Sequence, residues 1–316
     1  MPRSSNIHIL SASDNSFAQH LGVTIASLLE NSNHPQNIVY SVIDGGISDT
    51  NKKKLVSLFN KYGAKVKFLK VDKKIFEKYP TTDYWPTAIY YRLLIPQLLD
   101  SSIKKVIYLD CDLVIKDDIN NLWNVDIKDY PMAAVADNEG KLRFADLNLP
   151  EDSIYFNSGV MVLNLEFWRE NNIGEKIIDY IDKNTTKLLW PDQDALNVIL
   201  YNNWKPLHPK WNFQRNILYL LPQEQIFDIT TINRVLKEPS IIHFTTSSKP
   251  WFYNDEHPFK NEYYYYLSFT EWRNFKQVDK TLINVFKKSF KVILPKPLFN
   301  ILKKMNEMIK VLYKLN

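Results

Sequence analysis

Residues 104–112 have the sequence KKVIYLDCD, an apolar run that ends at Leu109 and leads directly into two aspartates, Asp110 and Asp112. The run is typical of a buried strand. Side chains two apart on a strand point to the same side, so the two carboxylates can face one hard cation. Because α/β proteins bind ligands beyond the carboxyl ends of their strands, this stretch predicts a metal-holding pair at the edge of a sheet.

The aspartate pair alone is weak support for a metal site. With 22 aspartates in the chain, chance predicts on the order of one or two D-x-D matches, and a second match occurs at Asp192 and Asp194. The strand that precedes Asp110 is what distinguishes the first pair. A solvated turn or a helix cap remains the alternative interpretation of that pair.

Strand and helix patterns alternate on both sides of this stretch. Ser48 is expected to cap the helix that starts at Asp49, and Gly63 is expected to end it. The alternation predicts an α/β fold with a Rossmann-like, mostly parallel sheet and helices on both faces. Strands are expected at 7–10, 38–43, 66–71, 104–109, 132–136, 159–163 and 240–244, and helices at 17–29, 49–62, 90–99 (kinked or ended by Pro96), 166–181 and 192–201.

The composition is that of a globular protein. Of the 316 residues, 45% are hydrophobic and 24% are charged, and no uncharged apolar run reaches the roughly 18 residues needed to cross a bilayer. The single cysteine, Cys111, cannot form an internal disulfide, and no secretory signal is recognised, so we expect a cytoplasmic location.

None of the seven glycines belongs to a glycine-rich phosphate loop. A bound nucleotide would need side chains or a metal to hold its phosphates.

The C-terminal part differs in character from the rest. We divide the chain into an α/β domain at 1–250 and an aromatic, Lys-rich, mostly helical extension at 251–316. Residues 278–316 contain nine lysines against Asp279 and Glu307, a net charge of +7, whereas the whole chain carries +5. From Pro297 onward, apolar residues recur at helical spacing among lysines, which predicts a basic amphipathic helix. Such a helix can lie peripherally on the anionic inner face of the cell membrane, or it can pack on the α/β domain.

Several short segments stand in a fixed order along the chain: SDNSF at 13–17, VIDGGIS at 42–48, YYRL at 90–93, VIYLDCD at 106–112, YFNSGV at 155–160, DQDALN at 192–197, and IH at 242–243 with KPW at 249–251. In this order and spacing they resemble glycosyltransferase family 8, which includes bacterial lipooligosaccharide galactosyl- and glucosyltransferases and, more distantly, glycogenin. The resemblance covers roughly residues 7–251. It implies a GT-A fold and a catalytic domain at 1–250. The implied reaction is the retaining transfer of galactose or glucose from a UDP-sugar to a hydroxyl of a glycan or lipid-linked saccharide.

The resemblance implies that Asp110, Asp112 and His243 ligate a divalent metal, usually Mn²⁺, with Mg²⁺ as the second choice. Two carboxylates and one imidazole leave coordination positions open for diphosphate oxygens, and a nitrogen ligand favours Mn²⁺ over Mg²⁺. A single histidine after a strand is more often a core residue. The position of His243 ahead of the KPW segment favours the ligand.

The same resemblance assigns residues to the nucleotide and its diphosphate. Asp14 matches an acidic residue that contacts the uracil ring, although it can instead cap the following helix. Ser16 stands where many relatives have an asparagine beside the ribose. Arg92 and Lys249 match cations near the diphosphate, where fixed positive charge stabilises the leaving group.

The transferred sugar is assigned to a third group of residues. Asp137, Asn157, Asp192 and Gln193 match the family's sugar pocket, where carboxylates and amides bond hydroxyls in pairs; Asp194 is a weaker candidate. Gln193 matches the residue beneath the anomeric carbon, but an amide is a poor nucleophile. We therefore expect a front-face mechanism in which the departing phosphate helps to deprotonate the acceptor. The metal, Arg92 and Lys249 then stabilise the developing charge, and Gln193 gives electrostatic support. We expect Gln193, Asp192 and Arg92 to be the catalytic residues.

Other functions remain open. The pattern Asp110-x-Asp112-x-Val114 after an apolar strand also fits the nucleophile loop of haloacid-dehalogenase-type phosphatases, although that loop usually follows the first strand. A non-catalytic nucleotide-sugar-binding protein is a further alternative. The basic tail lacks arginine, which argues against nucleic-acid binding. The acceptor is expected over the aromatic residues after Trp251, although those residues can equally be core.

Overall fold

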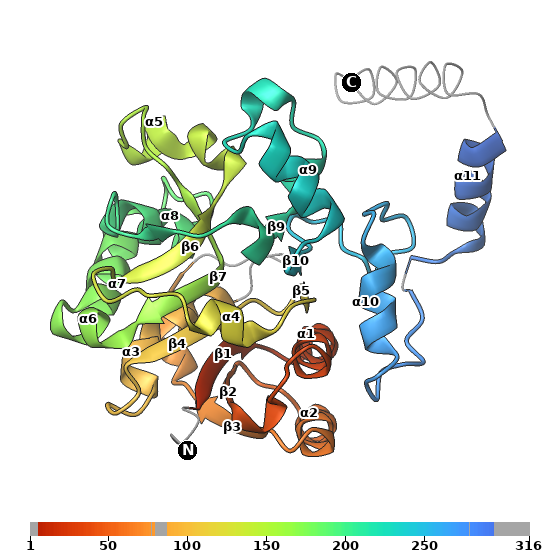
Figure 1. Cartoon of the computed structure of the whole chain (residues 1–316), viewed down its shortest axis with the longest axis horizontal. Coiled ribbons are helices and arrows are strands. Elements are labelled where there is room, and N and C mark those ends of the chain that lie inside the picture. Colours follow the sequence, from red (N-terminus) through yellow and green to blue (C-terminus); the bar gives the residue numbers. More distant parts are fainter. Residues whose placement is uncertain (1–5, 77, 80–86, 278, 294–316) are drawn as a thin grey trace.

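The computed structural model describes residues 6–76, 78–79, 87–277 and 279–293, arranged as Figure 1 shows. Seven strands form the central sheet in the order β3-β2-β1-β4-β7-β6-β8. β7 runs against its two neighbours and the other pairs are parallel, which confirms the predicted mostly parallel sheet. The strands are β1 (Ile7–Ser13), β2 (Ile38–Asp44), β3 (Lys65–Lys70), β4 (Lys105–Leu109), β6 (Met132–Ala136), β7 (Phe156–Asn164) and β8 (Lys205–Pro206).

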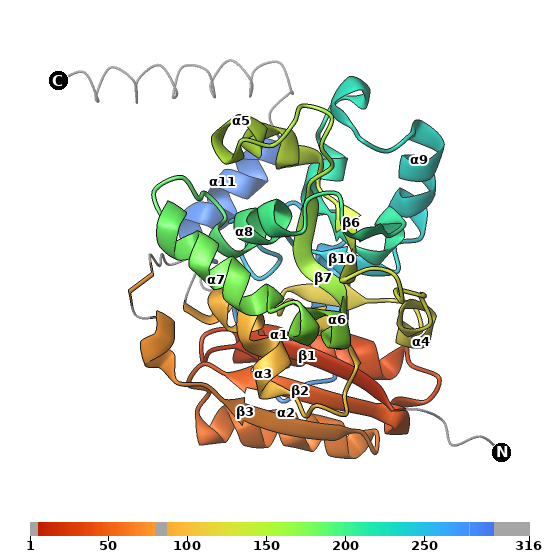
Figure 2. The ribbon, with the colours of Figure 1, turned by 90° about the vertical axis from the view of Figure 1, so that its left-hand side faces the viewer.

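The sheet separates two apolar cores. On β4, Ile107 and Leu109 pack into one core, whereas Val106 and Tyr108 pack into the other, because successive side chains of a strand point to opposite faces. Figures 1 and 2 show helices on both faces. One face carries α1 (Ala18–Glu30), α2 (Asp49–Lys61) and α10 (Lys260–Leu267), and the other carries α3 (Ile95–Leu98), α6 (Leu165–Glu170), α7 (Ile173–Asn184) and α8 (Pro191–Ile199).

The local signals that predicted α2 act as expected. Ser48 Oγ accepts a hydrogen bond from the backbone N–H of Asn51 at 3.3 Å, and Asp49 lies in the first turn, where the helix dipole favours negative charge. Gly63 follows the helix with a φ of +65°, a conformation that costs residues with a Cβ about 1–2 kcal/mol. The helix therefore begins and ends where the sequence indicates.

Two expected helices are divided. The helix expected over 90–99 is instead a stretch of 3₁₀ turns, η3 (Thr87–Leu94), followed by the short α3. Pro96 lies in the first turn of α3, where its missing N–H costs no hydrogen bond. The helix expected over 166–181 is split into α6 and α7, because Asn172 adopts a left-handed backbone with a φ of 51° between them. The expectation of one continuous helix over 166–181 was wrong. The expectation of a helix from Tyr90 that Pro96 kinks or ends was also wrong, because Pro96 lies at the start of α3 and does not interrupt it.

A second, small sheet brings distant parts of the chain beside the end of β4. Its strands are β5 (Leu113–Ile115), β10 (Ile241–His243) and β9 (Phe213–Gln214), in that order. β10 pairs antiparallel with β5, so that His243 lies opposite Leu113, and it pairs in parallel with β9. The shorter elements are α4 (Ile119–Trp123), α5 (Phe144–Leu147), α9 (Ile229–Lys237) and the 3₁₀ turns η1 (Pro35–Asn37), η2 (Lys73–Phe76), η4 (Asn138–Arg143), η5 (Pro209–Trp211), η6 (Arg215–Leu218) and η7 (Pro222–Glu224).

The aromatic region after residue 250 packs on α1. Trp251 stacks on His20 with ring centroids 3.5 Å apart, and Tyr263 Oη lies 2.7 Å from His20 Nδ1. Trp251, Tyr263 and Tyr266 are all buried, so these three side chains belong to the core. Burial lowers the pKa of His20 to about 3, and the ring is therefore neutral where it lines the stack.

α11 (Leu282–Ile293) stands apart from the sheet in Figure 1. Its Leu282, Ile283 and Phe286 are exposed at 89%, 66% and 65%. The amphipathic helix predicted from Pro297 onward lies outside the described residues, and the domain division at residue 250 stays a prediction. Among the described residues, none of the helices combines the length and the hydropathy that a membrane crossing requires.

Candidate active site

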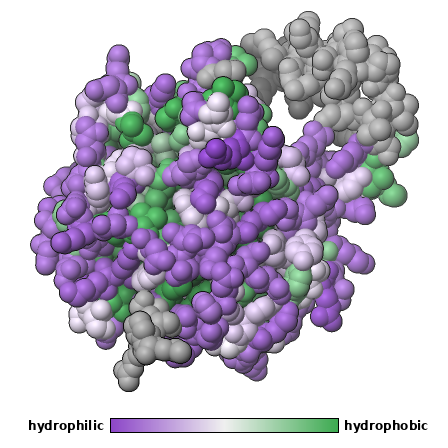
Figure 3. Space-filling view, viewed as in Figure 1, coloured by the Kyte–Doolittle hydropathy of each residue, from purple (hydrophilic) through white to green (hydrophobic). Residues whose placement is uncertain are grey.

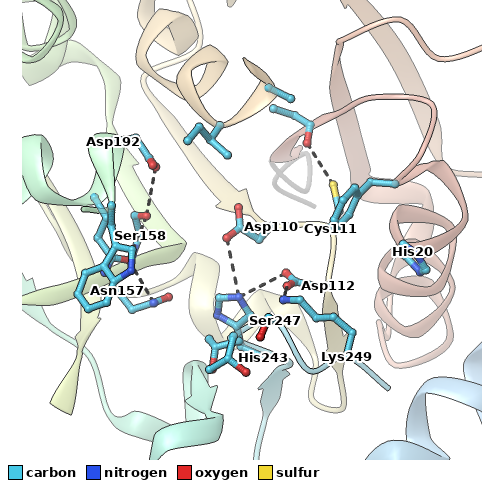
Figure 4. A pocket seen from close by; sticks show the side chains of 18 of the residues that line it. His20, Asp110, Cys111, Asp112, Asn157, Ser158, Asp192, His243, Ser247 and Lys249 are labelled. Carbon is cyan, nitrogen blue, oxygen red and sulfur yellow. Dashed lines mark hydrogen bonds and ion pairs between the residues drawn. The ribbon is translucent and has the colours of Figure 1, made fainter. Parts of the chain in front are cut away.

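A cavity of about 900 Å³ opens at the carboxyl ends of β1 and β4. β7 runs in the opposite direction, so its first residues reach the same edge of the sheet. Figure 4 shows side chains from separate segments converging there. The residues that the sequence assigned to the site all line this cavity: Asp14, Ser16, Arg92, Asp110, Asp112, Asp137, Asn157, Asp192, Gln193, His243 and Lys249.

Asp110, Asp112 and His243 form a cluster whose ligand atoms all lie within 4.8 Å of one another. His243 Nε2 is 3.3 Å from Asp112 Oδ1 and 3.8 Å from Asp110 Oδ2, contacts that Figure 4 marks with dashed lines. The pairing of β10 with β5 creates the cluster, because it sets His243 beside the turn that carries both aspartates. The three residues that the sequence proposed as metal ligands are thus brought together.

The cluster fits a divalent cation by its chemistry and by its space. Carboxylate oxygens with one imidazole nitrogen suit several first-row divalent metals, and three ligands leave coordination positions for oxygens of a bound molecule. Gly159 provides the space, since a Cβ at that position would lie 2.2 Å from His243 Cε1. Gly159 thus leaves room for the imidazole beside the two carboxylates, and the three residues together can hold a cation.

Lys249 offsets part of the negative charge of this cluster. Its Nζ lies 2.6 Å from Asp112 Oδ2 and donates to the carbonyl of Phe244, also at 2.6 Å. Burial acts to raise the pKa of Asp112, but Lys249 and His243 outweigh burial and hold that pKa well below its usual range. Asp112 is therefore ionised at neutral pH, as a metal ligand must be.

Arg92 links the cluster to the other end of the cavity. Its Nη2 lies 2.8 Å from Asp110 Oδ1 and its Nε lies 3.2 Å from Asp192 Oδ2. Nη1 donates to the backbone oxygen and to Oγ of Ser158, both at 3.0 Å, and the guanidinium lies over the ring of Tyr108 at 4.5 Å. Arg92 is only 5% exposed. A planar guanidinium with this many partners is held in one orientation, so its charge has a fixed place.

The other end of the cavity holds a buried polar group. Asn157 Nδ2 donates to Asp137 Oδ2 at 3.3 Å, and Asn216 Nδ2 donates to Asp137 Oδ1 at 3.0 Å. This group contains the four residues that the sequence assigned to the sugar: Asp137, Asn157, Asp192 and Gln193.

Burial perturbs both carboxyls of this group. It raises the pKa of Asp137, although hydrogen bonds from neighbouring amides oppose the shift. Burial is also the main reason that the pKa of Asp192 rises to about 6; Arg92 opposes this shift and the charge of Asp110 adds to it. Carboxyls with perturbed pKa values inside a cavity are a common mark of functional sites.

The side chain of Gln193 is held by one backbone N–H and by neighbouring side chains. Its Oε1 accepts from the N–H of Ser158 at 2.9 Å and from Asn157 Nδ2 at 3.2 Å. A backbone N–H can only donate, so this contact determines which end of the amide is the oxygen. The amide nitrogen then lies 3.4 Å from Asp137 Oδ2. The carbonyl oxygen of Gln193 is therefore already engaged by the protein.

Asp14 lies where β1 ends and caps the turn that leads into α1. Its Oδ1 accepts from the N–H groups of Ser16 and Phe17 at 2.9 and 3.0 Å, and from Ser16 Oγ at 2.6 Å. The sequence left open that Asp14 caps the helix itself, but the N-cap of α1 is Phe17, without a side-chain cap, and Asp14 holds the turn before it. Because Asp14 also lines the cavity, its second carboxylate oxygen can serve a ligand at the same time.

Asp194, the weaker candidate, does not line the cavity. It is completely buried, where it accepts from Tyr155 Oη at 2.6 Å, from the N–H of Leu189 at 2.8 Å and from Arg143 Nη2 at 3.1 Å. Residues two apart on a helix face different directions. Of the second D-x-D match, Asp192 therefore lines the cavity, whereas Asp194 points away from the cavity and binds Arg143 and Tyr155.

Two buried amides of the site were missed from the sequence. Asn212 lies between Asn157 and His243, and Asn216 bonds Asp137. Both flank β9, a strand of two residues that has no periodic pattern of its own. The sequence carries no signal that separates them from surface asparagines.

The fold and the site are those of a GT-A-type glycosyltransferase: a mostly parallel sheet whose strand ends present an Asp-Asp-His cluster beside a polar pocket. Residues 8–255 match the family model described as Glycosyl transferase family 8. The chain belongs to this family and is therefore a glycosyltransferase, which confirms the resemblance stated above. The phosphatase alternative is wrong, because the segment that carries Asp110 lies within the match to the glycosyltransferase family.

Three comparisons illustrate this membership. General stress protein A of Bacillus subtilis is 41% identical over 270 residues, covering 84% of this chain and 94% of the relative. A lipopolysaccharide 1,2-glucosyltransferase of Escherichia coli is 30% identical over 272 residues, covering 83% and 78%. The crystal structure of the galactosyltransferase LgtC with donor and acceptor sugar analogues superposes with a TM-score of 0.75 at 22% identity, covering 84% and 96%. The last comparison confirms the GT-A fold.

Proposed function

We propose that the protein is a retaining hexosyltransferase with Mn²⁺ as its cofactor. It would move galactose or glucose from a UDP-sugar to a hydroxyl of a surface glycan or lipid-linked saccharide. The observation that carries the proposal is the single cavity that contains both the Asp-Asp-His cluster and the buried polar group around Asp137. A cation cluster suits a diphosphate, and paired carboxylates and amides suit sugar hydroxyls. The names of the glucosyltransferase and galactosyltransferase relatives support a hexose donor.

Each part of such a donor has groups to receive it. The Oδ2 atom of Asp14 can accept the uracil N–H, since the turn contacts of Asp14 use Oδ1. Lys249 brings a positive charge to the place where the diphosphate would bind, and a bound cation would supply further charge to the same oxygens. Asp137 and Asp192 can accept hydroxyl protons of the hexose. The cavity thus offers a polar or charged group for each part of the proposed donor, from base to sugar.

The hydrogen bonds of Gln193 support a reaction that retains the anomeric configuration of the sugar without a covalent intermediate. Its Oε1 accepts the N–H of Ser158, so it is not free to attack an anomeric carbon. We infer that a leaving-phosphate oxygen accepts the acceptor's proton on the same face of the sugar from which the phosphate departs. Arg92 and Lys249 would stabilise the charge that develops on that phosphate. Gln193→Ala should then lower turnover by about 10–100-fold, and nearly full turnover at saturating donor would remove Gln193 from the mechanism.

UDP release from UDP-galactose and UDP-glucose, with Mn²⁺ and with excess chelator, tests the proposal. We expect release from one of these donors that stops on chelation and returns when Mn²⁺ is added back. Asp112→Asn should abolish it, whereas the matched variant Asp117→Asn, which lies in an ion pair with Lys210 outside the cavity, should not. Binding without release from any common donor would favour the non-catalytic alternative. The anomeric configuration of the product, read by proton NMR, tests retention.

We further propose that the C-terminal extension lies on an anionic membrane surface, where a lipid-linked acceptor would be found. Figure 3 shows apolar side chains at the position of α11, near the grey atoms at the right edge. The exposed apolar residues of α11 are Leu282, Ile283 and Phe286. The net charge of residues 278–316 is +7. Exposed apolar groups combined with positive charge favour anionic bilayers.

Co-sedimentation with vesicles that contain phosphatidylglycerol tests this membrane proposal. The full chain should sediment with these vesicles and remain in solution with neutral phosphatidylcholine vesicles. Deletion of residues 295–316, and separately Phe286→Ser, should each reduce the bound fraction. Unchanged sedimentation of the deletion variant would overturn the proposal and favour a helix that packs on the catalytic domain.

A further inference from the structure

Asn212 is a completely buried residue that joins the two ends of the cavity. Its Oδ1 lies 2.9 Å from His243 Nδ1, and its Nδ2 donates to Asn157 Oδ1, also at 2.9 Å. Asn212 immediately precedes β9, and the pairing of β9 with β10 brings it beside the imidazole. It therefore contacts one residue of the cation cluster and one residue of the sugar pocket.

The direction of each hydrogen bond in this chain follows from one backbone group. The N–H of Gly159 donates to Asn157 Oδ1 at 3.0 Å, and because a backbone N–H can only donate, that atom is an oxygen. The Asn212 atom that faces it must be the amide nitrogen, so the other is the oxygen. An amide oxygen only accepts, so His243 Nδ1 carries the hydrogen. In the neutral ring, Nε2 then keeps its lone pair and faces Asp112 Oδ1 at 3.3 Å.

The same reasoning extends to the sugar end. With Oδ1 assigned, Asn157 Nδ2 is a donor, and it lies 3.3 Å from Asp137 Oδ2 and 3.2 Å from Gln193 Oε1. The N–H of Ser158 independently assigns the Gln193 oxygen at 2.9 Å. Two backbone N–H groups thus impose one consistent direction on the bonds from the sugar pocket to the imidazole.

We propose that Asn212 is a positioning residue. It holds His243 in the Nδ1–H tautomer, with Nε2 presented to the cation, and it couples that ligand to Asn157 in the sugar pocket. The inference rests on the proposed function, because it requires His243 to ligate a metal. Metal-binding histidines depend on the partner of their second nitrogen, and loss of that partner typically weakens metal binding about 10–100-fold.

Two variants separate the two contacts of Asn212. Asn212→Leu has a similar volume and removes both hydrogen bonds. Asn212→Asp keeps an acceptor for His243 Nδ1–H but places an oxygen against Asn157 Oδ1. Mn²⁺ affinity is measured from the EPR signal of the free ion, which needs no turnover. We expect about 10–100-fold weaker Mn²⁺ binding in Asn212→Leu and a change of less than about threefold in Asn212→Asp.

The tautomer and the sugar contact each have a direct measurement. Long-range proton–nitrogen correlation spectra of ¹⁵N-histidine-labelled protein, assigned with His243→Gln, should show Nδ1–H for His243 in wild type but not in Asn212→Leu. Asn212→Asp should raise the KM for the UDP-sugar about tenfold while Mn²⁺ affinity holds, because Asn157 Oδ1 loses one of its two donors and faces an oxygen instead. A variant that removes bonds elsewhere, Asn31→Leu at the end of α1, should alter neither quantity.

The outcomes distinguish this inference from the proposed function. Wild-type Mn²⁺ affinity or an unchanged His243 tautomer in Asn212→Leu would overturn the role of Asn212 and leave the metal site intact. If Asn212→Leu does not fold, Asn212→Asp decides: an unchanged KM for the donor would overturn the coupling to the sugar pocket. Wild-type protein that binds no Mn²⁺ would overturn the proposed metal dependence and, with it, this inference.

Discussion

A Cβ at Gly159 would lie 2.2 Å from Cε1 of His243 and 2.8 Å from Oδ2 of Asp110. Non-bonded carbon atoms pack at about 3.5–4.0 Å, so β7 can approach the imidazole this closely only because residue 159 has no side chain. The backbone of Gly159 also contributes, since its carbonyl accepts the N–H of Asp110 at 2.8 Å. This glycine sets the distance between the strand and the cation cluster.

Gly159→Ala should therefore displace His243 and weaken Mn²⁺ binding by at least about tenfold, measured by EPR of the free ion. Gly63→Ala is the matched control, because Gly63 has a φ of +65° at the end of α2 and does not line the cavity. Strain at Gly63 should lower the free energy of unfolding by about 1 kcal/mol and leave Mn²⁺ binding unchanged. Equal Mn²⁺ affinity in Gly159→Ala and wild type would show that His243 is not a ligand.

Asp192→Asn should stabilise the fold while it impairs the enzyme. Burial raises the pKa of Asp192 to about 6, so keeping it ionised at pH 7 costs roughly 2–3 kcal/mol relative to the unfolded chain. The folded-state pKa of Asp192 is higher than its unfolded-state pKa, so the protonated carboxyl is favoured by folding. Its contribution to the free energy of unfolding is fully present below about pH 4 and is lost as the pH rises through about 6. Urea unfolding at pH 7 should show the Asp192→Asn variant to be more stable than wild type by about 1–3 kcal/mol, with a smaller difference at pH 5. Sugar transfer should fall by about 100-fold.

Asp194→Asn is the control for this substitution, and the expected change in stability has the opposite sign. Asp194 is fully buried and paired with Arg143 and Tyr155, so a neutral amide leaves a buried guanidinium without that carboxylate. The free energy of unfolding should fall by about 3–5 kcal/mol. Equal destabilisation by Asp192→Asn and Asp194→Asn would show that Asp192 is a structural residue as well.

The features that could be predicted from the sequence are those whose signals are local. The strand that ends at Leu109 follows from an apolar run, and the limits of α2 follow from Ser48 and Gly63. The break between α6 and α7 was missed because the apolar periodicity continues across it, whereas the left-handed backbone of Asn172 interrupts the helix. Periodicity reports which side chains are buried and not where the backbone changes direction.

The candidate site was predictable to a similar extent. Asp110, Asp112 and His243 lie at strand ends. Arg92 lies in η3 and Gln193 in the first turn of α8, and all of these residues line the cavity. Asn212 could not be found, because its importance comes from the pairing of β9 with β10, which depends on tertiary contacts. The sequence likewise identified Arg92 without indicating that Asp110 and Asp192, from two other segments, both pair with it.

Lys249→Met should separate charge stabilisation from metal binding. Lys249 Nζ lies 2.6 Å from Asp112 Oδ2, so its removal frees that carboxylate and should leave Mn²⁺ affinity equal or higher. Turnover should fall by about 100–1,000-fold, because the leaving diphosphate loses a fixed positive charge. Lys210→Met removes a more exposed ion pair outside the cavity, with Asp117 at 3.4 Å, and should leave turnover unchanged. Parallel losses of Mn²⁺ affinity and turnover in Lys249→Met would contradict this division of roles.

Arg92→Lys tests whether the geometry of the guanidinium matters beyond its charge. Lysine keeps the positive charge but cannot bridge Asp110 and Asp192 while it also donates to Ser158. The free energy of unfolding should fall by about 2–4 kcal/mol, and kcat/KM for the UDP-sugar should fall at least about 100-fold.

Arg169→Lys is the matched control, since Arg169 donates to several backbone carbonyls, including that of Pro96, and does not line the cavity. It should lower stability, measured by urea unfolding, without changing turnover at a temperature where both proteins are folded. If Arg92→Lys keeps more than about half of the wild-type turnover, positive charge alone suffices at this position. The link that Arg92 makes between the cation cluster and Asp192 would then support the fold and not the reaction.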